Sequence, residues 1–83
     1  MPVIQKIIPN NVNYVRNSDI LFIHLEPFTH FYGDEADDNF FVMRSEKDDR
    51  ILGFQILDYS RHAPSKIQAF LLSEGYELDS MPK

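Results

Sequence analysis

The fold is decided by residues 39–58, which read NFFVMRSEKDDRILGFQILD. Two apolar runs, residues 39–45 and residues 50–58, flank the polar tetrapeptide EKDD at residues 46–49. Short runs rich in Ile, Phe and Val favour strands over helices, and a polar connection of about four residues is typical of a hairpin. The stretch therefore predicts two strands that pair antiparallel.

Further strands are predicted on the N-terminal side of this hairpin. Residues 19–25, DILFIHL, have the same density of Ile, Leu and Phe and form the clearest of them. Weaker candidates are residues 3–8, 12–16 and 28–32. The acidic stretch at residues 33–38, GDEADD, is predicted to be a solvated loop.

The pattern becomes helical after Tyr59. Ser65 and Gln68 have the spacing of a capping box, in which the two side chains bind free backbone N–H groups at the helix start. The apolar residues that follow share one helix face: Ile67, Phe70 and Leu71. Gly75 stands where a left-handed C-terminal cap is expected. The sequence therefore predicts one short amphipathic helix, followed by a dispensable tail at residues 78–83.

The predicted fold class is α+β, an antiparallel β-meander of four to six strands with one C-terminal helix packed on one face. With 83 residues and no linker-like or repetitive segment, residues 1–83 are expected to form a single domain. Gly53, inside the last predicted strand, indicates a bulge or a close backbone approach. The apolar N-terminal residues are far fewer than the about 18 that a membrane span needs, so no membrane partner is expected.

Composition excludes several classes of function. There is no cysteine, which excludes disulfides and thiolate sites and fits a reducing cytoplasm. The formal net charge of −5 comes from 8 basic and 13 acidic residues, which makes nucleic acid an unfavourable partner and a basic protein a favourable one. Three isolated glycines exclude a phosphate-binding loop, and no serine lies in a Gly-x-Ser-x-Gly elbow. No catalytic residue and no cofactor is predicted.

The predicted strands are apolar on both faces, where a sheet with one wet face would alternate apolar and polar residues. One short helix covers one face, so we expect another surface to cover the other, most simply in a homodimer. The alternative is that the N-terminal segment, residues 28–32 and the tail after Gly75 fold over that face, or that the sheet curls enough to enclose it. The predicted interface residues are Ile20, Phe22, Phe40, Val42, Ile51 and Leu57.

A metal or small-ligand site is the alternative function. Its candidate residues are His24, His30, Asp34 and Glu35, because imidazole and carboxylate groups are the side chains that bind metals or exchange protons. The two histidines are six residues apart with Pro27 between them, so spacing alone does not bring them together. The acidic stretch also lacks the order of ligands of an EF-hand loop. The leading prediction therefore remains a non-enzymatic interaction module.

Three segments carry a resemblance to a known family. They are residues 19–25 (DILFIHL), residues 38–42 (DNFFV) and residues 49–58 (DRILGFQILD). Between residues 14 and 62 the chain resembles small prokaryotic proteins catalogued as domain of unknown function 2283, with Gln55 where those proteins usually have an acidic residue. The resemblance implies a compact β-meander with a helix, and it brings no established activity and no catalytic residues.

Overall fold

The computed structural model describes residues 3–79, 81 and 82 and has an α+β fold, as predicted. Five strands form an antiparallel sheet in the order β2-β3-β6-β5-β4. The bounds of these strands are β2 (Val12–Val15), β3 (Ile20–His24), β4 (Phe31–Asp37), β5 (Phe40–Ser45) and β6 (Ile51–Leu57). The hairpin predicted from residues 39–58 is therefore confirmed as β5 and β6, which are the two strands next to the sheet edge at β4.

The sheet is a meander only in part. Strands β4, β5 and β6 follow one another through short turns, but β3 lies beside β6 rather than beside β4. The segment between β3 and β4 therefore crosses from the middle of the sheet to its edge. This crossover, residues 25–30, runs past the end of β6, where the N–H groups of Leu25 and Glu26 both donate to the carbonyl oxygen of Leu52.

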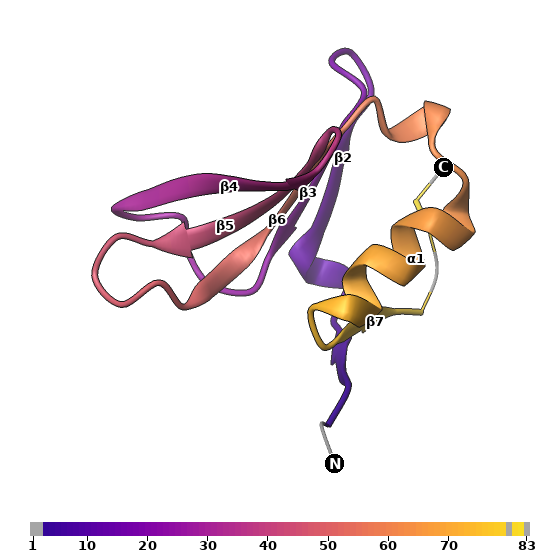
Figure 1. The fold of residues 1–83 in the computed structure, drawn as a ribbon. Coiled ribbons are helices and arrows are strands. Elements are labelled where there is room, and N and C mark those ends of the chain that lie inside the picture. The colour runs from indigo at the N-terminus through magenta and orange to yellow at the C-terminus, as the bar shows by residue number, and fades with distance from the viewer. Residues whose placement is uncertain (1–2, 80, 83) are drawn as a thin grey trace.

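The remaining elements gather on one side of the sheet (Figure 1). Helix α1 (Pro64–Ser73) is followed by strand β7 (Tyr76–Leu78), which pairs in parallel with β1 (Gln5–Ile7). Two short 3-10 helices, η1 (Pro9–Asn11) and η2 (Tyr59–Arg61), complete the order of elements. The predicted strand at residues 3–8 therefore exists, but it belongs to a separate two-stranded sheet.

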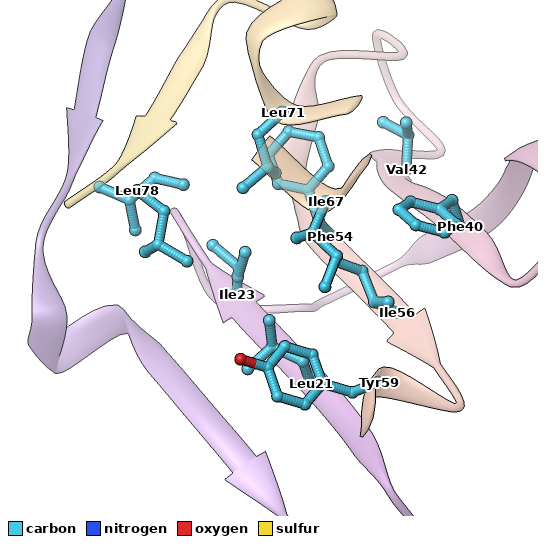
Figure 2. Packing of buried hydrophobic residues seen from close by; sticks show 11 residues of the cluster. Leu21, Ile23, Phe40, Val42, Phe54, Ile56, Tyr59, Ile67, Leu71 and Leu78 are labelled. Atoms are coloured by element: carbon cyan, nitrogen blue, oxygen red, sulfur yellow. The ribbon is translucent and has the colours of Figure 1, made fainter. Parts of the chain in front are cut away.

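The main hydrophobic core lies between α1 and the large sheet. Ile67 and Leu71 of α1 are buried against the apolar side chains of β3 and β6, and Figure 2 shows them beside Phe54 and Ile23. Ile7 of β1 and Leu78 of β7 belong to the same cluster, which is closed by two pairs of aromatic rings in edge-to-face contact, Phe40–Phe70 and Phe54–Phe70. The predicted amphipathic face of the helix is thus confirmed.

The start of α1 differs from the prediction. Pro64 occupies the first turn, Ala63 is the N-cap residue, and no side chain caps the helix. Proline at this position removes one of the free N–H groups that a capping box would satisfy, and its fixed φ is compatible with the first helical turn. Gln68 instead bonds both backbone groups of Leu78, at 2.9 Å and 2.6 Å. The predicted capping box is therefore wrong, whereas the left-handed cap at Gly75 is confirmed by its φ of 91°.

Two further expectations were wrong. The acidic stretch predicted as a loop forms most of β4, whose seven residues are all exposed. An edge strand tolerates such residues because charged side chains on an open edge discourage unwanted pairing. The tail predicted as dispensable supplies Leu78, which is buried, and the carbonyl oxygen of Pro82, which accepts a hydrogen bond from the Tyr59 hydroxyl at 2.6 Å. Ser80 and Lys83 of that tail lie outside the described residues.

Candidate functional site

The candidate site is the sheet face that does not bear the helix, called the open face below. The strand register decides which residues lie on it. Leu21 of β3 is opposite Ile56 of β6, and Ile56 is in turn opposite Phe40 of β5. All three side chains therefore point toward the helix, and their neighbours along each strand point to the open face.

Phe40 and Val42 were predicted at the interface and do not lie there. Both are on the helix side, each with 1% of its area exposed, within the core cluster that includes Ile67 and Leu71 (Figure 2). A side chain that is already enclosed by its own chain has no surface to offer a partner. This part of the prediction is wrong for a physical reason. Alternation along one strand separates its residues into two faces, but only the register between strands shows which residues of neighbouring strands share a face of the sheet.

Ile51 was also placed on the wrong face. The pairing of β5 with β6 shifts between Met43 and Arg44, so that Gly53 is opposite Met43 and Ile51 is opposite Arg44. Leu52 is the extra residue, and such a bulge reverses the facing of everything beyond it. Ile51 accordingly packs against the helix-side core. The bulge that Gly53 indicated is therefore real and lies directly beside it.

The crossover covers one end of the open face. A Cβ atom added to Gly53 would lie 2.7 Å from the ring of Phe28, so the missing side chain of Gly53 is what admits this ring. Phe28 continues into a row of aromatic contacts, with centroid separations of 4.1 Å to His24 and 5.3 Å to Phe31. Met43, which is opposite Gly53, is buried at this end. The predicted alternative, that residues 28–32 fold over the second face, is therefore partly confirmed.

The other end of the open face remains accessible. Its apolar residues are half-buried, because neighbouring side chains flank them within the sheet. They are Val15, Ile20, Phe22, Phe41 and Leu57, and we call them the open patch. Three of them, Ile20, Phe22 and Leu57, were predicted at the interface. Val15 and Phe41 were missed, and their positions opposite Ile20 and Gln55 could have been found only with the strand register.

The open patch is almost free of charge. Among the described strand residues that point to this face, Glu35 is the one carboxylate and there is no Lys or Arg. Glu35 lies on the edge strand, opposite Phe41, and its side chain accepts a long hydrogen bond from the backbone N–H of Asn39, at 3.4 Å. The patch can therefore contact another apolar surface without burying a Lys or Arg side chain, and Glu35, on the edge strand, is the one charged side chain beside it among these described residues.

The predicted metal ligands are not gathered into a cluster. His24 is stacked between Phe22 and Phe28, His30 is exposed ahead of β4 with a φ of 48°, and Asp34 forms an ion pair with Arg44 at 3.5 Å. Glu35 points to the open face. In the described part of the chain, no group of three or more His, Asp or Glu side chains is arranged to hold a metal ion.

A polar cluster lies at the end of the sheet where the turn between β2 and β3 meets the C-terminal end of β6. Asp19, in the turn before β3, accepts hydrogen bonds from the hydroxyls of Tyr14 and Ser60, at 2.6 Å and 2.7 Å. The bond from Tyr14, followed by that from Ser60, lowers the pKa of the Asp19 carboxyl below its usual value. Asp19 is half-buried and also accepts a hydrogen bond from the backbone N–H of Ser60, at 3.0 Å, so the cluster ties the turn to η2. Sequence reasoning missed this tie, which links residues 41 positions apart.

Comparison with protein-family models gave no match, and the comparisons with curated proteins and with solved structures gave none either. The resemblance to domain of unknown function 2283 therefore stays a prediction. Within the described residues, no helix has the length and hydropathy needed to cross a bilayer.

Proposed function

We propose that this chain is a small interaction module without catalytic activity, which self-associates through the open patch. The observation that carries the proposal is the position of Phe22, which is half-buried on the sheet face opposite α1 and lies between the apolar neighbours of the open patch. Its neighbours across the strands, Asn13 and Gln55, are uncharged. Apolar patches of this kind on small domains mark surfaces that bind other proteins.

A second copy of the chain is the partner that fits the patch best. The whole chain carries a net charge of −5, so two copies repel each other over most of their surfaces. The open patch is a place where they can meet without opposing like charges. A two-fold symmetric contact would put Phe22 of each copy against the patch of the other, which is the commonest arrangement of small homodimers.

Self-association is tested with a Phe22→Thr variant. Threonine keeps a high preference for strands, and the polar neighbours of position 22 tolerate its hydroxyl. If each copy loses burial of about 40 Å² of apolar area, the loss is about 1 kcal/mol per copy and about 2 kcal/mol per dimer, which raises the dimer Kd roughly thirtyfold. Sedimentation velocity at matched concentrations measures this change.

Leu72→Thr is the matched control for that experiment. Leu72 is an exposed apolar residue on α1, away from the sheet, so its replacement is expected to leave the dimer Kd unchanged. Circular dichroism of both variants checks that the fold is retained. Equal association of the wild type, Phe22→Thr and Leu72→Thr would show that the open patch is not the contact.

A basic protein is the second partner that we propose. The support for it is electrostatic: the chain has five more acidic than basic residues, and β4 presents Asp34, Glu35 and Asp37 along one edge of the sheet. Opposite charge speeds encounter and disfavours acidic competitors. The lack of cysteine fits a cytoplasmic location for both kinds of complex.

A further inference from the structure

A cleft separates the end of β4 from the side of α1. Its volume is about 370 Å³, which is enough for one long side chain. Phe40 and Phe70, whose rings are in edge-to-face contact, supply apolar lining, and Ala36 on the β4 side has only a methyl group. The cleft arises because α1 covers the middle of the sheet and leaves the edge strand β4 uncovered.

The charges that line the cleft favour a cation. Asp37 contributes a carboxylate from β4, Glu74 contributes another from the end of α1, and Lys66 is the one cation in the lining. Lys66 is directed at the ring of Phe40, with its Nζ 5.5 Å from the ring centroid. None of the ion pairs between described residues involves Asp37 or Glu74. The lining thus holds one negative charge in excess.

The strand beside the cleft has an open edge. β4 pairs with β5 on one side only. The N–H of Glu46 donates to the carbonyl oxygen of His30, and bonded and non-bonded pairs alternate along an antiparallel ladder. The backbone groups of Phe31, Gly33 and Glu35 consequently point away from β5, toward the free edge. An edge of this kind accepts an added strand from another chain.

We propose that an extended, arginine- or lysine-rich segment of a partner protein adds to the free edge of β4 and places one basic side chain in the cleft beside Asp37 and Glu74. The inference rests on the proposed binding of a basic protein and assigns it a location. Strand addition supplies backbone hydrogen bonds, and the cleft supplies selectivity for the cation. A second copy of this chain is a poor occupant, because its own β4 would set acidic side chains against acidic side chains.

The probe is a short synthetic peptide that alternates arginine and valine, with a fluorescent label, and its acidic counterpart alternates glutamate and valine. Binding is followed by fluorescence anisotropy of the label and by amide chemical shifts of the protein. We expect the basic peptide to bind and the acidic peptide not to bind. Amide shifts are expected at Phe31, Gly33 and Glu35, whose backbone groups face the edge.

Two pairs of variants locate the peptide. Gly33→Pro removes one outward donor and keeps the bonds to β5, whereas Gly33→Ala keeps that donor, and a Cβ atom at this position meets only ordinary contacts at 3.5 Å. We expect Gly33→Pro to weaken binding severalfold relative to Gly33→Ala. Asp37→Asn and Glu74→Gln are each expected to weaken it about threefold to fivefold, and Glu46→Gln, outside the cleft, less than twofold.

The outcomes separate the location from the function on which it rests. If the affinity for the basic peptide is the same in Gly33→Pro, Asp37→Asn and Glu74→Gln as in the wild type, the proposed location is wrong. The proposal of a basic partner would be unaffected by that result. Equal or absent binding of both peptides would overturn the basic partner itself. The oligomeric state is measured in the same samples, so a change in self-association is not mistaken for a change in peptide binding.

Discussion

Replacing Gly53 by alanine tests the packing that divides the open face into a covered end and an open patch. The added Cβ would clash with the carbonyl oxygen of Ile23 and would lie 2.7 Å and 2.9 Å from two ring carbons of Phe28. The ring can swing away. The oxygen cannot, because β3 is held in the sheet between β2 and β6.

The expected cost exceeds that of ordinary overpacking. Extra methyl groups in a packed core cost about 1–3 kcal/mol, and here the contact is with the backbone of a central strand, so we expect at least about 3 kcal/mol. In a domain of this size each kcal/mol lowers the Tm by roughly 4–8 °C. Gly53→Ala is therefore expected to lower the Tm by about 12 °C or more.

The assay is urea and thermal unfolding followed by circular dichroism. Gly33→Ala is the matched control, because its Cβ meets Met43 and Phe41 only at 3.5 Å, an ordinary contact distance. We expect this control to stay within about 0.5 kcal/mol of the wild type. Equal unfolding midpoints for Gly53→Ala and Gly33→Ala would refute the close approach of β3 and Phe28 to Gly53.

Two further predictions concern ties outside the open face. Gln68→Ala is expected to cost about 1–2 kcal/mol in urea unfolding, because it removes both hydrogen bonds to the backbone of Leu78, whereas Ser65→Ala, which removes no cap, should cost less than about 0.5 kcal/mol. The lowered pKa of Asp19, caused first by the Tyr14 hydroxyl, means that the ionised carboxylate stabilises the fold above the ordinary carboxyl pKa and that this stabilisation is lost as pH falls through the lowered value. Wild-type stability should therefore fall more steeply than that of Asp19→Asn below about pH 4, and parallel acid-unfolding curves would contradict this role.

The fold could be predicted where apolar residues are dense. The runs at residues 19–25, 39–45 and 50–58 coincide with β3, β5 and β6 to within a residue at each end. These strands are buried on the helix side, so the hydrophobic pattern that specifies them is also the pattern visible in the sequence. The helix could be predicted for the same reason, since Ile67 and Leu71 face the core.

The edges of the fold could not be predicted in this way. β4 is an edge strand whose side chains are all exposed, so its residues need not be apolar. Its acidic sequence therefore gave no hydrophobic pattern from which a strand could be predicted. The pairing of β1 with β7 joins the two ends of the chain, and three residues at each end give no local signal of parallel pairing. Gln68 matched a capping box by spacing, but its partner is Leu78, ten residues away.

The sequence predicted that the candidate site is an apolar sheet face, but it identified only some of the residues on that face. The apolar residues on both faces of β3 correctly indicated that the open face is apolar as well as the face that bears the helix. Alternation alone, however, assigned Ile51 to the face of Leu57, and the bulge at Leu52 places it on the other. Bulges and register depend on contacts between distant strands, which a single sequence does not display.

Sedimentation equilibrium of the unmodified chain, over a range of concentrations up to high micromolar, bears most directly on the role of the open patch. If Val15, Ile20, Phe22, Phe41 and Leu57 bind a second copy, the apparent mass rises with concentration from that of one chain toward that of two. A mass equal to one chain at every concentration would contradict self-association and leave the open patch without its proposed partner.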